Sequence, residues 1–171
     1  TEDTIITVAT STQDADIPQE SRLVMSKRRE REMAKSASYW DIVENHDISR
    51  EATINSLKKI VNLEGVKILL KPHPNESTEF WKKTISEFPK GRIFIQEGGS
   101  IQDLLSVSNL HITNNVCTTT FEAKLNKIMT VEIQTSLSKK LFEEVHLNVA
   151  DYQVFSPDQA FKVVKEALLN R

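Results

Sequence analysis

A histidine between two prolines is the first feature of this sequence that could do chemistry. It lies in "LLKPHPNE" (residues 69–76), directly after an apolar run, with Pro72 and Pro74 on either side of His73. Proline fixes its own backbone and pushes the preceding residue into extended geometry, so we expect a stiff loop. A rigidly held imidazole could donate a hydrogen bond to an anionic oxygen. The alternative interpretation is a histidine that only bonds the local backbone.

Three consecutive threonines form a second candidate site, in "HITNNVCTTTFEAK" (residues 111–124). Thr118, Thr119 and Thr120 stand where a helix is expected to begin. The hydroxyls and unpaired N–H groups of a helix start, together with the helix dipole, suit a phosphate. The spacing of Thr119 and Glu122 also matches a capping box, which needs no ligand. Both interpretations stay open.

A glycine pair marks a third candidate loop, "EGGS" (residues 97–100). Gly98 and Gly99 would let a nucleotide base approach the backbone closely. The alternative is a plain loop that ends at a Ser100 helix cap.

The elements that would position these loops alternate between strand and helix. Apolar runs predict strands at 4–10, 66–71, 92–96, 109–113 and 129–133, and helical patterns lie at about 21–45, 49–63, 77–88, 100–107, 118–126 and 157–170. This alternation predicts an α/β fold, a doubly wound, mainly parallel, Rossmann-like sheet with helices on both faces. Such sheets bind ligands outside the carboxyl ends of their strands. His73 and the threonines could therefore share one phosphate there.

The composition indicates a single domain over residues 1–171, of which 39% are hydrophobic and 27% charged. A net charge of -2 argues against nucleic acid as a partner. Residues 22–35 nevertheless carry six Lys and Arg against two Glu, a local excess of +4 that could contact a membrane surface. The single Cys117 excludes an internal disulfide, and no apolar run reaches the length of a membrane span. We therefore expect a cytoplasmic protein, with the inner face of the membrane as an alternative location.

Two segments carry a resemblance to a known family. "KILLKPHPNE" and "IQDLLSVSNLHITNNVCTTTFEAKLNKIMTVEI" resemble the carboxy-terminal domain of GT-B glycosyltransferases of surface-polysaccharide synthesis, such as capsule and lipopolysaccharide. The resemblance covers roughly residues 66–133 and is greatest to groups with a His-Pro motif, such as Kdo or sialic acid transferases, which use CMP-sugars. In that family this domain, one half of the GT-B fold, binds the nucleotide of the donor.

The resemblance also implies roles for individual residues. His73 and the hydroxyls at the helix start would contact phosphate, His73 would act in catalysis by stabilising the leaving nucleotide, and Glu122 would approach the ribose. The predicted nucleotide-binding set is His73, Pro74, Glu76, Gly98, Gly99, Thr118, Thr119, Thr120 and Glu122. No metal and no cofactor are expected.

The chain departs from the family's pattern in two loops. "ATSTQDADIPQE" (residues 9–20) contains no glycine, where family members often have a small or glycine-rich turn. "NKI" (126–128) replaces a Gly-x-Pro-like turn, and Asn126 is expected to adopt the left-handed backbone that ends a helix.

These observations predict an enzyme that transfers a sugar from a CMP-sugar, with UDP and CDP donors as alternatives, to a glycan or lipid-linked acceptor. The family's general base belongs to an amino-terminal domain without a counterpart here, and the chain begins at Thr1 without an initiator methionine. We therefore expect part of a longer two-domain enzyme that is inactive alone. Two other functions stay open: a non-catalytic regulatory or scaffold module of the same fold, and a nucleotide-sugar epimerase.

Overall fold

The computed structural model describes residues 3–29, 38–115, 117–141 and 149–169. The strands are β1 (Thr4–Ala9), β2 (Val66–Lys71), β3 (Ile93–Ile95), β4 (Leu110–Asn114), β5 (Met129–Ile133) and β6 (Tyr152–Val154). The helices are α1 (Gln19–Arg29), α2 (Tyr39–Ile60), α3 (Thr78–Ile85), α4 (Ile101–Leu105), α5 (Thr118–Leu125), α6 (Ser136–Leu141) and α7 (Pro157–Leu169), with a short 3-10 helix, η1 (Gln13–Asp16).

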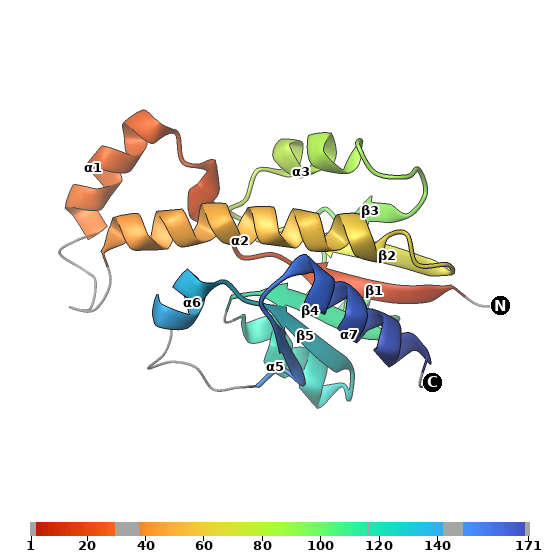
Figure 1. Cartoon of the computed structure of the whole chain (residues 1–171). Helices are drawn as coiled ribbons and strands as arrows, with labels where there is room; N and C mark the ends of the chain where they lie inside the picture. Colours follow the sequence, from red (N-terminus) through yellow and green to blue (C-terminus); the bar gives the residue numbers. More distant parts are fainter. Residues whose placement is uncertain (1–2, 30–37, 116, 142–148, 170–171) are drawn as a thin grey trace.

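The strands form one parallel sheet in the order β3-β2-β1-β4-β5-β6 (Figure 1). The chain builds outward from β1 through β2 to β3, then returns to the other side of β1 and builds outward again. The predicted doubly wound, Rossmann-like fold is therefore confirmed. Its topological switch point, where ligands of such folds usually bind, lies between β1 and β4.

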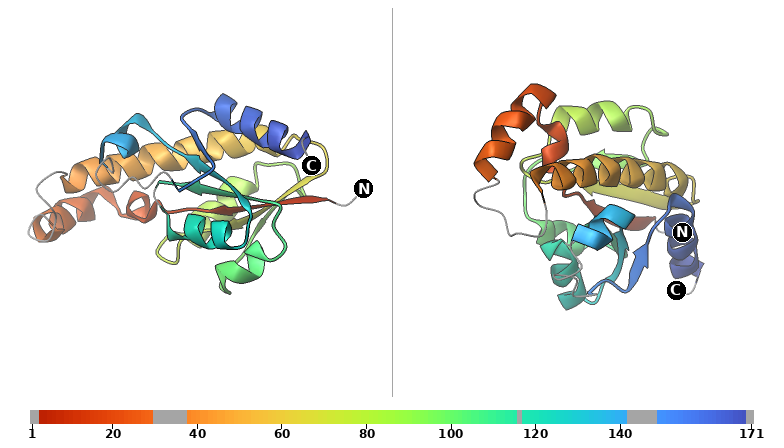
Figure 2. Two further views of the ribbon diagram at one scale, coloured as in Figure 1. Left: turned by 90° about the horizontal axis from the view of Figure 1, so that it is seen from below. Right: turned by 60° about the vertical axis from the view of Figure 1, so that its left-hand side comes forward.

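Helices cover both faces of the sheet. Figure 2 shows α2 and α7 on one face and α4 and α5 on the other. The main apolar core lies between the sheet and the α2, α3 and α7 layer, and includes Ile6, Leu57, Ile68, Trp81, Ile112 and Val164. A smaller cluster, Leu105, Ala123 and Ile128, lies under α4 and α5. On this second face the strands also bury polar side chains, among them His111 and Thr113.

The long helix α2 differs from the prediction. The sequence indicated helices at 21–45 and 49–63, whereas α2 runs unbroken from Tyr39 to Ile60 after a Ser38–Asp41 capping box. The gap between the two predicted helices begins at the polar residue His46 and ends before Ser49, which is also polar. Both are instead buried against the loops of the sheet.

Two elements near the carboxyl end, α6 and β6, were not predicted. Strand β6 has three residues, of which only Val154 is buried, so it carries too little apolar periodicity to be recognised.

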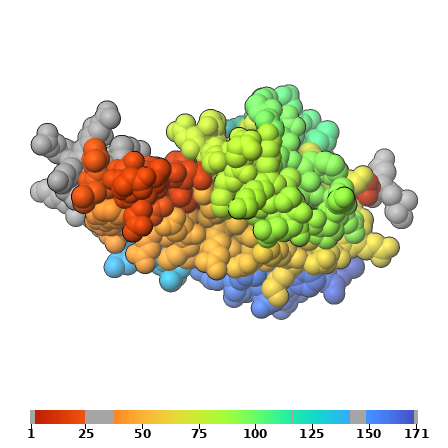
Figure 3. Space-filling view, turned by 90° about the horizontal axis from the view of Figure 1, so that it is seen from above, coloured from red at the N-terminus to blue at the C-terminus, as the bar shows by residue number. Residues whose placement is uncertain are grey.

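The segment after β1 packs beside the start of α2. Figure 3 shows η1 and the beginning of α1 (red) against α2 (orange), next to α3 (yellow-green).

No described helix is long and apolar enough to cross a membrane. The predicted basic surface of residues 22–35 is described only in part: the Arg22 guanidinium bonds Asp47 and the Ile17 carbonyl, and the side chains of residues 25–35 lie outside the described part of the structure.

Candidate functional site

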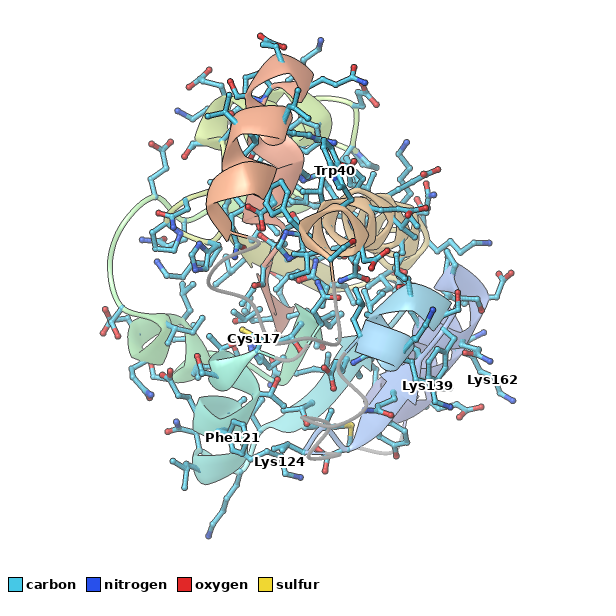
Figure 4. The ribbon with its side chains drawn as sticks, turned by 90° about the vertical axis from the view of Figure 1, so that its left-hand side faces the viewer. Trp40, Cys117, Phe121, Lys124, Lys139 and Lys162 are labelled. Carbon is cyan, nitrogen blue, oxygen red and sulfur yellow. The ribbon has the colours of Figure 1, made fainter. Side chains whose placement is uncertain are left out.

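The carboxyl edge of the sheet gathers the three candidate loops, because all six strands run in the same direction. Figure 4 views this edge, with Cys117 near its centre and Phe121 and Lys124 further along α5. Ala9 of β1 pairs with Lys71 on one side and Thr113 on the other. The ends of β2 and β4 are therefore two strand spacings apart at this level, about 10 Å.

The His73 loop is a tight turn with a fixed imidazole. The Glu76 N–H donates to the His73 carbonyl at 2.8 Å, and the Asn75 N–H donates to His73 Nδ1 at 3.2 Å. Since Nδ1 accepts a hydrogen bond, the neutral ring carries its proton on Nε2. The Nε2–H group is thus the one that can donate to a ligand.

His73 lines a pocket with the glycine pair. The pocket has a volume of about 390 Å³ and is lined by Lys71, Pro72, His73, Pro74, Thr78, Ile95, Gln96, Glu97, Gly98 and Gly99. Lys71 Nζ donates to the carbonyls of Gly98 and Gly99, at 2.7 and 2.9 Å. Both glycines have a φ of 69°, which residues with a Cβ rarely adopt. Four residues of the predicted nucleotide-binding set therefore meet in one place.

Of the three threonines at the start of α5, Thr118 is exposed, whereas the hydroxyls of Thr119 and Thr120 contact other side chains. Thr118 is exposed, and its hydroxyl has no protein partner among the described residues. Thr119 Oγ1 lies 3.0 Å from His111 Nε2, and buried Thr120 Oγ1 lies 3.1 Å from Thr113 Oγ1. Only the first of the three hydroxyls faces solvent without such a bond.

The capping box that was one interpretation of Thr119 and Glu122 does not form. The N-cap of α5 is Cys117, which makes no side-chain capping bond. Glu122 Oε2 instead accepts from Gln102 Nε2 of α4 at 2.6 Å. At the other end of the helix, Lys127 rather than Asn126 takes the left-handed backbone, with a φ of 58°.

The Gln102–Glu122 bond connects the two parts of the candidate site. Gln102 lies in the first turn of α4, directly after the Gly98–Gly99 loop and its Ser100 cap. The pocket at His73 and the start of α5 are thus joined through one short segment. The second oxygen of Glu122, Oε1, has no protein donor within the described ranges.

Glu76 is buried, and both oxygens of its carboxylate are engaged. Oε2 accepts from Thr10 Oγ1 and Trp81 Nε1, each at 2.6 Å. Oε1 accepts from the backbone N–H of Thr12 and from Thr12 Oγ1. Glu76 is therefore set back from the pocket that His73 and Pro74 line.

Polar residues of α2 fill the switch point between β1 and β4, a feature that the sequence did not reveal. Asn115 Oδ1 accepts from Asn45 Nδ2 at 3.1 Å and from Ser49 Oγ at 3.0 Å. The Ser11 N–H donates to Asn114 Oδ1 at 2.8 Å. The available signal was the stripe of Asn45, Ser49 and Thr53, spaced four residues apart on one helix face.

The "DAD" acidic pair (residues 14–16) faces α2 and does not resemble a metal site. The carboxylate of Asp16 accepts from Nη1 and Nη2 of Arg50, at 2.7 and 2.8 Å. Burial alone would raise the pKa of Asp16, but the bonds from Arg50 and the Ser77 N–H lower it overall. Asp14 lies 3.2 Å from His46 Nδ1. Within the described ranges, no three His, Cys, Asp or Glu residues are grouped as metal ligands.

Comparisons with known proteins add little to this site. Neither a scan against models of protein families nor a search of curated proteins finds a match. Among solved structures, the chain is similar to one described as "Structure of the Chlamydomonas rheinhardtii Moco Carrier Protein". The two share 16% sequence identity over 99% of each chain, with a TM-score of 0.39. This likeness carries no argument about ligand or activity.

Proposed function

We propose that this chain is the donor-binding domain of a GT-B type glycosyltransferase, with a CMP-sugar as the favoured donor and UDP- or CDP-sugars as alternatives. The observation that carries the proposal is the pocket in which His73 and Pro74 meet Gly98 and Gly99 at the carboxyl edge of the sheet. The family resemblance supports the same ligand, and the confirmed fold usually binds ligands at this edge.

The proposed chemistry is stabilisation of the leaving nucleotide. The Nε2–H of His73 donates to a phosphate oxygen, and the exposed Thr118 hydroxyl and the N–H groups of the first turn of α5 face the same phosphate. Donors that are already oriented stabilise the negative charge that develops as the bond to the sugar breaks. Glu122 Oε1 accepts a ribose hydroxyl, while Gln102 holds the other oxygen.

The acceptor in this proposal is a surface glycan or a lipid-linked precursor, and the general base comes from another domain. The protein works in the cytoplasm, at the inner face of the membrane, where the basic residues between 22 and 35 would contact anionic lipid.

The variant His73→Ala tests the proposal. We expect CMP binding to weaken by about 1.5 to 3 kcal/mol, the usual loss of a hydrogen bond to a charged group. Cytidine, which lacks the phosphate, should bind the variant and the parent equally. Calorimetric titration with both ligands measures the difference. Equal losses for CMP and cytidine would show that His73 does not contact the phosphate.

A further inference from the structure

Glu76 connects the His73 turn to the loop after β1. The turn spans residues 73 to 76, and Glu76 closes it with the N–H that donates to the His73 carbonyl. The side chain of the same residue then bonds Thr10 and Thr12, which are 66 and 64 positions away in the sequence. The orientation of His73 therefore depends on where the Glu76 carboxylate is held.

The hydrogen bonds around Glu76 require a carboxylate. The Thr12 N–H at Oε1 and the Trp81 Nε1–H at Oε2 can only donate. A glutamine at this position would place its own NH₂ group against one of these donors in either orientation. No rotamer of glutamine can satisfy both sides.

Arg50 holds Thr12, one of the residues that bond Glu76, in place. Its Nε donates to Thr12 Oγ1 at 3.0 Å, which leaves the Thr12 hydroxyl proton for Glu76. The guanidinium also bonds the Thr12 carbonyl at 2.9 Å and lies 4.4 Å from the centre of the Phe80 ring. Glu76 and Arg50 are each 6% exposed, so this network is rigid and largely dry.

We propose that Glu76 is a positioning residue that aims His73 Nε2 at the ligand phosphate and sets phosphate affinity without touching the ligand. This inference rests on the proposed function, in which His73 contacts a phosphate. The two residues of this motif then have different roles. His73 contacts the ligand, and Glu76 holds the turn that orients His73.

Three variants test the role of Glu76. Glu76→Gln keeps the size of the side chain and removes one acceptor, and Thr10→Val removes one donor while the carboxylate stays. Thr130→Val is the matched control, because Thr130 is also a buried threonine bonded to a carboxylate, Asp151, but lies at the opposite end of the sheet. Thermal unfolding of each variant shows which of them fold.

The first measurement needs no ligand. The ¹⁵N spectrum of the imidazoles, with the His73 signals assigned from His73→Ala, reports which ring nitrogen carries the proton. We expect the Nε2–H form in the parent and in Thr130→Val, and a mixture of both forms in Glu76→Gln and Thr10→Val. An unchanged His73 ring in folded Glu76→Gln would overturn the positioning role. If Glu76→Gln does not fold, Thr10→Val decides in the same way.

The second measurement compares CMP with cytidine by calorimetric titration. The preference for CMP should fall about tenfold in Glu76→Gln, as expected when one charged hydrogen bond is misaligned. The double variant with His73→Ala should lose no more than His73→Ala alone. Additive losses would mean that Glu76 does not act through His73. A parent that binds both ligands equally would refute the proposed function, and the ring spectrum would still decide the role of Glu76.

Discussion

At the scale of single residues, two buried side chains have pKa values shifted in opposite directions. Burial lowers the pKa of His111 from 6.5 to about 4, and the Thr7 backbone opposes this only in part. Burial raises the pKa of Glu132 from 4.5 to about 7, against the hydrogen bond from Gln153. Both groups therefore favour their neutral forms in the folded protein.

These shifts affect stability with opposite signs. Between pH 4.5 and 7 the unfolded chain releases the Glu132 proton and the folded chain keeps it, so stability falls as pH rises. Between pH 4 and 6.5 the unfolded chain protonates His111 and the folded chain does not, so stability rises with pH. Where the two ranges overlap, the contributions largely cancel.

The variant Glu132→Gln exposes this cancellation. Relative to the parent, its free energy of unfolding should increase by about 2 to 3 kcal/mol between pH 5 and pH 7.5. Above pH 7.5 the difference should stay constant, since Glu132 is then ionised in both states of the parent. Urea unfolding of both proteins at pH 5, 6, 7 and 8 measures this. A difference that does not change with pH would contradict the raised pKa of Glu132.

At the scale of elements, the proposed contact between Glu122 of α5 and the ribose can be tested with the variant Glu122→Gln. Glutamine at this position can still accept from Gln102, so Glu122→Gln should melt within a few degrees of the parent. The substitution removes the charged carboxylate that is proposed to accept from the ribose hydroxyls, so CMP should bind more weakly by about 1 to 3 kcal/mol.

A 2′,3′-dideoxy analogue of CMP provides the control for Glu122→Gln. Without the ribose hydroxyls, parent and variant should bind the analogue equally. A loss that persists with this analogue would show that the substitution instead disturbs the start of α5, where phosphate is proposed to bind.

The sequence predicted elements where one local pattern decides the structure. Strands β2 and β5 match their predicted ranges, because continuous apolar runs mark buried parallel strands. The course of α2 could not be predicted locally, since the partners of His46 and Ser49, which are Asp14 and Asn115, come from other segments of the chain. The candidate site shows the same limit. Its motifs identified the loops, but no local pattern indicated that Glu76 bonds Thr10 and Trp81 or that Arg50 supports this contact.

At the scale of the whole molecule, the loops that carry His73, the glycine pair and Thr118 lie along a single edge of one sheet, where we propose that a nucleotide binds. In a GT-B enzyme the acceptor and the general base come from a second domain that faces this edge. We therefore expect the 171-residue chain to bind CMP but to transfer no sugar when incubated with a CMP-sugar and a lipid-linked acceptor. Release of free CMP and formation of glycosylated product are the readouts. Sugar transfer by this chain alone would contradict the proposal that a second domain supplies the general base.

The central place of β1 has a consequence for how the protein is made. Its neighbour β4 lies far along the chain: Asn109, which bonds the Ile5 N–H just before β4 begins, is 104 residues away. During translation β1 can pair with β2 early, but its other edge stays open until β4 has left the ribosome. An open apolar edge can pair with other nascent chains. The arrangement that creates the switch point thus leaves one edge of β1 unpaired while the 104 residues between Ile5 and Asn109 are synthesised, and we expect the nascent chain to be most prone to aggregation during that interval.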